Sequence, residues 1–427
     1  MGLANRTLQY ANLARKLLAA KFSKRPWPIS VSYNVTRFCN LRCSHCYAML
    51  EQLDQPDASL EQVLEVVDGL HKGGTLSIRL LGGEPLVRKD LPKVINRIKA
   101  HGMFCEVVTN GTLLRQRIAQ WPELAMVDSF SVSLDGDPTL HDQIRGAGVF
   151  EQTMDGIFAL REAGYPVRLH ATLANDSYDA HIPPHHFLAQ LSQEYGIPFN
   201  IATYAPNPGK NSREDEGNRR SFQRAIQVYK DLLDYHKQGV LVTTDRNILK
   251  KSIEWFDHTD KFRLFGDRSV IPKGYRKCQA GFRNCFIDSD GGMYTCPAHW
   301  KRGVSVYREG LAKAVEVLCA TRQKLGCQIC YNVSQWEYTR LFTFSDPRVL
   351  LNTARNIARL ILQRKRGRRL QRTAVPQMPL SVNGAFATIP PASEDARRAV
   401  QASATMQTCQ FDGGAVRTNS DPAEAVS

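Results

Sequence analysis

Short apolar runs alternate with helical patterns from residue 29 to about residue 240, and this alternation limits the fold more than any other feature of the chain. The runs with β-strand character are 29–35, 76–81, 104–109, 127–134, 167–173 and 199–204. The helical patterns between and after them are 59–71, 89–101, 112–119, 150–163, 184–195 and 217–238. Strands that alternate with helices at this spacing form parallel βαβ units. Such units fit either a doubly wound sheet or a partial barrel, and both place their sites at the carboxyl ends of the strands.

Three cysteines follow the first strand within a short loop: Cys39, Cys43 and Cys46. Thiolates this close can converge on one soft metal centre, and both a zinc site and a [4Fe–4S] cluster accept them. A structural zinc site usually takes four protein ligands, whereas a working centre keeps one position open. Three ligands therefore favour a cluster with a free iron that binds something else. A zinc site that takes a fourth ligand from elsewhere is the alternative.

This cysteine loop resembles that of the radical S-adenosylmethionine (SAM) superfamily, in which the free iron is chelated by the amino and carboxylate groups of SAM. His45 stands where the family usually has an aromatic residue. The sequence Gly82, Gly83, Glu84 at the end of the second strand resembles the family's GGE motif, which binds the amino group of SAM. The resemblance implies a partial (β/α)6 TIM-like barrel over 29–240, with a [4Fe–4S] cluster on the three cysteines and SAM as cofactor.

Two further segments resemble parts of the same family that contact the cofactor. Ser133 ends the fourth strand, where a hydroxyl commonly meets the cofactor ribose, and Ser131 on the same face is the alternate. Arg145 follows in a His-Asp-x-x-Arg-Gly segment, and its guanidinium offers two parallel donors to the cofactor carboxylate. A helix cap and a surface ion pair are the ordinary alternatives for Ser133 and Arg145. Asn175, after the fifth strand, is a further candidate contact.

A second set of cysteines begins at residue 278, around an Asp-Gly-Gly sequence that predicts a β-hairpin. Their spacing resembles the auxiliary-cluster domain called SPASM, or its shorter form, twitch. No closely spaced cysteines follow this set, so the resemblance implies one auxiliary [4Fe–4S] cluster, with zinc as the alternative for four thiolates. The expected ligands are Cys278, Cys296, Cys327 and Cys330, and Cys285 either substitutes for one of them or lies near the cluster as a fifth thiol. Cys105 and Cys319 are expected in the core.

The eleven cysteines and the net charge of +15 bear on compartment and partners. The chain shows no secretory leader and no apolar run of the ~18 residues that a membrane span needs, so clustered cysteines indicate metal ligands in a reducing cytoplasm. The basic amphipathic segments 1–28 and 339–372 either lie on an anionic membrane surface, as such helices can, or pack on the barrel with a solvated basic end. No base-reading motif accompanies them, so no nucleic-acid partner is expected.

The remaining segments complete the expected organisation. The expected divisions are an N-terminal helix and linker at 1–28, the barrel at 29–240, a connecting helical segment at 241–277, a SPASM/twitch-like auxiliary cluster domain at 278–338, a basic amphipathic helix at 339–372 and a disordered tail at 373–427. The loop 205–218 is a candidate lid or substrate wall, with a plain connection as the alternative. His181, His185 and His186 flank a Pro-Pro turn with no acidic residue between them, which favours a solvated loop over a metal site.

The resemblance implies a radical SAM enzyme that reductively cleaves SAM to a 5′-deoxyadenosyl radical and abstracts a hydrogen atom from an organic substrate. Oxidation, cross-linking and C–C bond formation are the outcomes open to it, and no catalytic residue of the chain itself is assigned. A flavodoxin or ferredoxin is the expected electron donor. The substrate classes are a peptide, a cofactor precursor, a sugar or a lipid. The short segment before the barrel disfavours a peptide, since it leaves no room for a leader-binding domain. The alternative of a different class is a non-catalytic Fe–S or zinc scaffold, or an electron-transfer protein.

Overall fold

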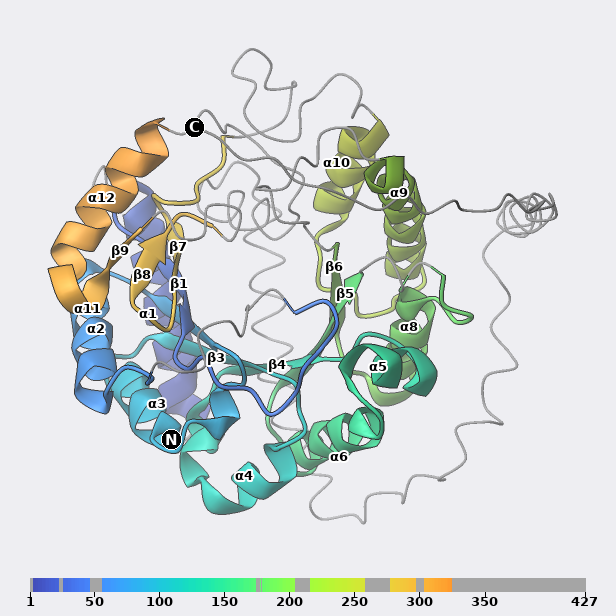
Figure 1. Cartoon of the computed structure of the whole chain (residues 1–427), viewed down its shortest axis with the longest axis horizontal. Helices are drawn as coiled ribbons and strands as arrows, with labels where there is room; N and C mark the ends of the chain where they lie inside the picture. Colours follow the sequence, from blue (N-terminus) through green and yellow to red (C-terminus); the bar gives the residue numbers. More distant parts are fainter. Residues whose placement is uncertain are drawn as a thin grey trace, which may run out of the picture. The chain divides into compact units, whose positions relative to one another are not determined.

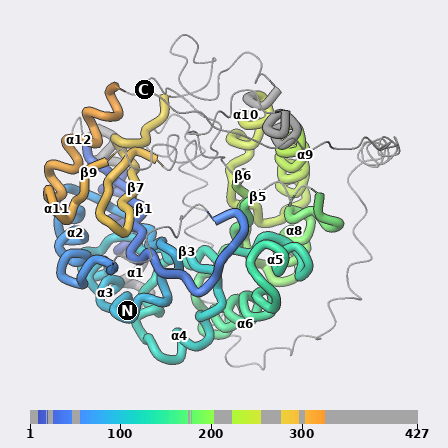
Figure 2. Tube along the Cα trace, viewed as in Figure 1, coloured from blue at the N-terminus to red at the C-terminus, as the bar shows by residue number. Residues whose placement is uncertain are grey.

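The computed structural model describes residues 3–22, 26–46, 56–173, 177, 179–203, 216–257, 277–296 and 303–324, all within one compact unit, Met1–Val375 (Figures 1 and 2). Its elements are, in chain order, α1 (Leu3–Phe22), β1 (Ser30–Asn34), α2 (Leu60–Gly73), β2 (Ser77–Leu81), η1 (Pro85–Val87), α3 (Leu91–Ala100), β3 (Phe104–Thr109), α4 (Leu114–Gln120), η2 (Pro122–Met126), β4 (Ser129–Ser133), α5 (Pro138–Arg145), α6 (Val149–Glu162), β5 (Val167–Leu173), α8 (Pro184–Tyr195), β6 (Phe199–Thr203), α9 (Glu216–Lys237), α10 (Arg246–Asp257), β7 (Asn284–Ile287), β8 (Gly292–Tyr294), β9 (Val304–Ser305), α11 (Val306–Glu309) and α12 (Leu311–Lys324). The predictions for Asn175, Cys327, Cys330, residues 205–215 of the loop 205–218, the helix 339–372 and the tail lie outside the described residues. Residues 216–218 of that predicted loop instead begin α9.

The six predicted strands form one parallel sheet, as the βαβ pattern requires. The sheet order is β6-β5-β4-β3-β2-β1-β7-β8-β9. Predicted and observed bounds agree for β3 and β5 and differ by one or two residues at the ends of the others. The crossover helices lie around the outside of the curved sheet (Figure 1). The predicted partial barrel is therefore confirmed, and the cysteine loop follows β1 at the edge formed by the carboxyl ends of the strands.

Alternate residues divide the sheet into an apolar outer face and a polar inner face, since side chains of a strand point to opposite sides. On the outer face, Val31 pairs with Ile78 and Ile78 with Cys105, and all three are fully buried. The next register position on the inner face pairs Arg79 with Glu106. The expectation of a core position for Cys105 is confirmed, and polar side chains line the inside of the barrel.

The predicted hairpin at the second cysteine set is confirmed as β7 and β8, which pair antiparallel across the Asp-Gly-Gly turn. β7 also pairs parallel with β1, with Cys285 opposite Val31, so the hairpin continues the barrel sheet. Burial and the neighbouring Cys319 raise the pKa of the Cys285 thiol well above its usual range. Cys319 lies on α12 and is buried, as predicted. Cys285 therefore packs between the sheet and α12.

The N-terminal helix α1 is anchored to the barrel by one buried side chain. Tyr10 is 6% exposed, its hydroxyl donates to Asp128 Oδ1 (3.0 Å), and its ring packs near Phe104. The other Asp128 oxygen accepts hydrogen bonds from the Cys105 amide (2.8 Å) and from Lys99. In the described part of the chain, no helix has the length and apolar character that a bilayer crossing needs.

Asp128→Ala is expected to destabilise the fold strongly. Lys99 is 4% exposed and Asp128 is its carboxylate partner. Removing one member of a buried ion pair costs about 3–5 kcal/mol. The matched control Tyr10→Phe removes one hydrogen bond to the same carboxylate but leaves the ion pair in place, and it should cost about 1.5–3 kcal/mol. Urea unfolding measures both free energies, and equal losses in the two variants would contradict the role given to the Lys99–Asp128 pair.

Candidate active site

The loop that carries the three cysteines lies against the two glycines that follow β2. The Gly83 amide donates to the Thr36 carbonyl oxygen (2.9 Å), and the next amide along the chain donates to that of Phe38 (2.8 Å). A Cβ atom on Gly83 would stand 2.2 Å from the Phe38 carbonyl oxygen, and one on Gly82 would stand 2.4 Å from that of Thr36. Because glycine alone lacks this atom, the pair lets the two backbones approach.

Glu84 joins the end of β2 to the end of β3. Its side chain is buried, and its Oε1 accepts hydrogen bonds from the Leu86 amide (3.0 Å) and the Thr109 hydroxyl (2.8 Å). Its Oε2 accepts a hydrogen bond from the Asn110 amide (2.7 Å). Burial raises the pKa of Glu84, while these hydrogen bonds act in the opposite direction because they favour the charged form. The family resemblance implies that this carboxylate binds the cofactor. In the structure it also links the end of β2 to the end of β3 through hydrogen bonds.

Asn40, between the first two cysteines, makes contacts that the sequence analysis missed. Its side-chain oxygen accepts a hydrogen bond from Asn110 Nδ2 (2.9 Å), and its Nδ2 donates to the Thr112 hydroxyl (2.9 Å). Asn110 and Thr112 belong to the turn after β3. The cysteine loop is therefore attached to the ends of both β2 and β3, and the only signal for Asn40 in the sequence is its place between two ligand cysteines.

A buried ion pair supports the other side of the loop. Arg145 Nε donates to Asp135 Oδ2 at 2.6 Å, and the two side chains are 9% and 0% exposed. Arg145 Nη1 also donates to Cys43 Sγ at 3.9 Å. Asp135 Oδ2 lies 3.9 Å from His45 Nε2. Burial alone would raise the pKa of Asp135, but the charges of Arg145 and His45 outweigh it and lower that pKa. The Arg145–Asp135 pair thus contacts the cysteine loop at Cys43 and at His45.

Helix α5 carries Arg145 and was not among the predicted helices. It begins with a recognisable signal: Asp137 accepts a hydrogen bond from the Leu140 amide (3.1 Å), and Pro138 occupies the first helical position. Near its end, the Ile144 carbonyl accepts a hydrogen bond from the Ser44 amide (3.0 Å). The helix therefore contacts the cysteine loop through its backbone as well as through Arg145.

Ser131 and Ser133 lie on the inner face of β4. Ser131 is 1% exposed, whereas Ser133 is half-buried at the end of the strand and pairs in register with His170 of β5. Because Ser133 is the more accessible of the two, its hydroxyl is better placed for a ligand at the strand ends.

The three thiols are close enough to influence one another's ionisation. Burial, with smaller contributions from Glu84, Cys43 and Cys46, raises the pKa of Cys39 to about 11, and the hydrogen bond from the Leu41 amide acts in the opposite direction. Burial also raises the pKa of Cys43, which the guanidinium of Arg145 opposes. Both shifts disfavour the thiolates, so a metal cluster bound here would have to supply positive charge in addition to that of Arg145.

The chemistry of the donor set fits a cluster. Cys39 and Cys43 are partly exposed and Cys46 is exposed, all on one loop. Three thiolates supply three of the four ligands that a [4Fe–4S] cluster takes, so one iron is left for another ligand.

A chain of charged side chains crosses the inner face of the barrel, and the sequence analysis did not predict it. Glu106 accepts hydrogen bonds from Arg79 (2.6 Å) and Arg168 (2.9 Å). Arg168 also donates to Asn200 Oδ1 (2.6 Å). Burial would raise the pKa of Glu106, but the two guanidinium groups lower it to about 2. Glu106 is therefore ionised near neutral pH, and this group of two arginines and one glutamate carries a net positive charge.

Two of the expected auxiliary ligands fall within the described residues. Cys278 is 8% exposed and Cys296 is partly exposed, and they lie on either side of the β7–β8 hairpin. The Ala280 amide donates to Cys278 Sγ at 3.4 Å. Cys327 and Cys330 lie outside the described residues, so the four-cysteine ligand set remains a prediction.

The expectation of a solvated histidine loop is wrong for His185 and His186. Both lie in the first turn of α8, where His185 is 5% exposed and His186 is half-buried. The acidic partner that the local sequence lacks is Asp231 of α9, whose Oδ2 lies 2.9 Å from His185 Nε2. His181, before the helix, is exposed as predicted.

Comparison with known proteins agrees with this geometry. Residues 33–179 match the family model described as the Radical SAM superfamily, a range that includes the cysteine loop, the glycine pair and Arg145. The Fe-coproporphyrin III synthase of Methanosarcina barkeri is 32% identical over 239 residues, which cover 54% of this chain and 59% of that protein. The mycofactocin maturase MftC of Mycobacterium tuberculosis is 26% identical over 283 residues, which cover 63% of this chain and 64% of that protein. The chain thus spans less than two thirds of either curated relative.

A solved structure shares the fold. Streptococcus suis SuiB, bound to its precursor peptide SuiA, superposes with a TM-score of 0.54 at 17% identity, covering 75% of this chain and 72% of that one. At this identity the likeness concerns the fold alone, and it agrees with the partial barrel.

Gly83→Ala is expected to lose most of the iron bound by the cysteine loop, because the new methyl group displaces the Phe38 carbonyl oxygen. Gly102→Ala is the matched control: Gly102 has φ +69° with nothing within 4 Å of an added Cβ, so it adds only about 1–2 kcal/mol of backbone strain. Iron and labile sulfide per chain after anaerobic reconstitution measure the effect. Equal iron in the two variants would show that the glycine contact does not shape the loop.

Proposed function

We propose, from the Radical SAM domain that residues 33–179 form, that this protein is a radical SAM enzyme that cleaves SAM reductively and abstracts a hydrogen atom from an organic substrate. The observation that carries the proposal is that Cys39, Cys43 and Cys46 lie on one loop that is attached to two strand ends and to α5. When bound there, a reduced [4Fe–4S] cluster would supply the electron that splits SAM into methionine and a 5′-deoxyadenosyl radical, which takes the hydrogen atom. A flavodoxin or ferredoxin is the proposed reductant.

The residues around the loop have separate proposed tasks. Gly82 and Gly83 let the loop backbone lie close to the end of β2. The carboxylate of Glu84, which follows them, is the proposed hydrogen-bond acceptor for the amino group of SAM. Arg145 places a positive charge beside Cys43, which favours its thiolate, and stands ready to pair with a carboxylate. Ser133 offers a hydroxyl at the strand ends for the ribose, and His45 takes the place beside the last cysteine. These groups position the cofactor, and the barrel interior excludes water from the reacting atoms.

An auxiliary [4Fe–4S] cluster on Cys278, Cys296, Cys327 and Cys330 is part of the proposal. It would accept an electron from the substrate radical or bind the substrate directly. The hairpin that precedes Cys296 is paired to β1, the strand that leads into the cysteine loop. Because this hairpin continues the barrel sheet, its pairing supports a proposed auxiliary centre near the barrel, as electron exchange between two centres requires.

The relatives narrow the substrate that we propose. One is named for making Fe-coproporphyrin III and another for maturing mycofactocin, and SuiB was solved with a precursor peptide. We therefore place this protein in the maturation of a cofactor precursor or a peptide, ahead of a sugar or a lipid. The reaction class, whether oxidation, cross-linking or C–C bond formation, follows from the fate of the substrate radical.

We further propose that the protein works in the cytoplasm and contacts an anionic membrane surface through its basic amphipathic segments. Within α1, Arg15 is exposed while Tyr10 faces the barrel. The contact that we propose for this helix is therefore electrostatic, through exposed basic side chains such as Arg15.

The reconstituted, dithionite-reduced protein is expected to form 5′-deoxyadenosine from SAM and to contain about eight irons per chain, as two cubes require. Cys46→Ser should abolish 5′-deoxyadenosine formation, because the cluster loses a ligand. Cys409→Ser, which lies outside both predicted ligand sets, should leave iron content and product unchanged. Chromatography of the product and an iron assay provide the measurements. Full iron content with no 5′-deoxyadenosine would favour the electron-transfer alternative instead.

Sedimentation with lipid vesicles tests the membrane proposal. The protein should sediment with vesicles of phosphatidylcholine and phosphatidylglycerol but not with phosphatidylcholine alone. High salt should release it, because the screening length falls from about 10 Å at 0.1 M to about 3 Å at 1 M. Arg15→Glu should weaken binding more than Arg246→Glu, the same charge change at an exposed position of α10. Equal binding to both kinds of vesicle would contradict an electrostatic contact.

A further inference from the structure

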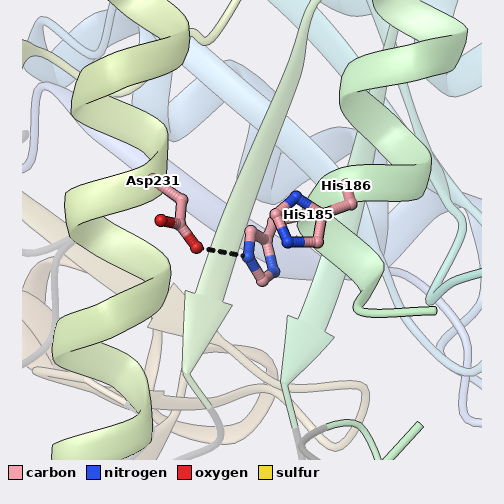
Figure 3. A group of neighbouring side chains, drawn as sticks. All are labelled: His185, His186 and Asp231. Atoms are coloured by element: carbon pink, nitrogen blue, oxygen red, sulfur yellow. Dashed lines mark hydrogen bonds and ion pairs between the residues drawn. The ribbon is translucent and has the colours of Figure 1, made fainter. Parts of the chain in front are cut away.

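Outside the cysteine sites, one group of side chains in the described part of the chain has the composition and spacing of a metal site. It consists of His185 and His186 on α8 and Asp231 on α9, which face one another in Figure 3. Their ligand atoms all lie within 4.8 Å of one another. His185 and Asp231 are each 5% exposed, and His186 is half-buried. Two imidazoles and a carboxylate are a common ligand set for zinc, with a fourth position for water.

Each of these groups is held by a second contact, as metal ligands usually are. Gln227 Nε2 donates to Asp231 Oδ1 (2.9 Å), which turns Oδ2 toward His185. Tyr235 makes a hydrogen bond through its hydroxyl to His186 Nδ1, which leaves Nε2 of that ring for another partner. Gln227, Asp231 and Tyr235 follow one another at intervals of four residues, so they share one face of α9.

In the metal-bound state His185 would coordinate through Nε2, the ring nitrogen that lies beside Asp231 Oδ2. The ion would take the place of the proton that joins these two atoms. His185 Nδ1 points away from the carboxylate and takes no part in the proposed site.

The distances require little movement to admit an ion. His185 Nε2 and Asp231 Oδ2 are 2.9 Å apart. Neighbouring ligands of one tetrahedral zinc ion, each about 2.0–2.1 Å from the metal, stand about 3.3 Å apart. The carboxylate also supplies the negative charge that two neutral imidazoles lack. We propose that His185, His186 and Asp231 bind a divalent transition-metal ion of the zinc class.

The position of the group suggests what such an ion does. β6 is the terminal strand of the sheet order, and α8 and α9 are the helices before and after it in the chain. An ion shared by the first turn of α8 and the middle of α9 would tie the two helices together at this edge of the barrel. The ion is therefore structural, and it is separate from the iron bound by cysteines.

Zinc and iron counts on the same sample test the proposal on the full-length chain. Cells are grown with added zinc, and the protein is reconstituted anaerobically and desalted before elemental analysis. The wild type is expected to retain about one zinc per chain beside its iron. Asp231→Asn and His186→Gln should each lose most of the zinc and keep the iron, while His181→Gln, an exposed histidine before the same helix, should keep both.

Cys46→Ser separates this site from the proposed function, since it should lose iron and keep zinc. Cobalt provides a second readout that does not depend on a variant folding. Co²⁺ bound by imidazole and carboxylate gives visible d–d absorption without the intense near-ultraviolet charge-transfer band of thiolate ligands. A wild-type protein without zinc, zinc retained by His186→Gln, or a cobalt-loaded protein without these d–d bands would each overturn the proposal.

Discussion

The cysteine loop depends on a backbone contact too close for any side chain. Carbonyl oxygens of the loop occupy the space where residues 82 and 83 would carry Cβ atoms, and the amide of Gly83 donates to one of these carbonyls. A segment with three thiols in eight residues has little apolar surface of its own and cannot fold against a core. Its shape therefore comes from hydrogen bonds to neighbouring strand ends. The glycine pair makes the first of these, Asn40 the second, and α5 supplies the third.

Paired charges explain how the barrel can be polar inside and still be stable. An unpaired charge in the interior would cost several kcal/mol, and three buried carboxylates of the described residues each have a cationic partner. Asp128, just before β4, pairs with Lys99 of α3. Glu106 of β3 lies between Arg79 and Arg168 on the inner face of the sheet. Asp135 pairs with Arg145 beside the cysteine loop. The last pair also shows how one interaction serves both stability and site geometry, since it joins the end of β4 to α5 beside Cys43.

The strands and most helices could be predicted because each is signalled by its own residues. The predicted bounds of β3 and β5 match the structure to the residue. Both segments are short runs rich in apolar residues, and each lies between residues typical of turns. The helix α5 was missed because eight residues give too few turns for a periodic pattern, although Asp137 and Pro138 mark its start. The hairpin was predicted from its turn, but its pairing with β1 was not, because strand order leaves no local signal.

The sequence by itself determined the βα repeat, the place of the cysteine loop after the first strand, and the place of Gly82, Gly83 and Glu84 at the end of the second. Only the tertiary structure decided which side chains meet at the site. Arg145 and Cys43 are 102 residues apart in sequence, Asn40 and Asn110 are 70 apart, and His185 and Asp231 are 46 apart. Local periodicity reports whether a face of an element is buried, not what it is buried against. For this reason His185 was expected in solvent and was found beside a carboxylate that a neighbouring helix supplies.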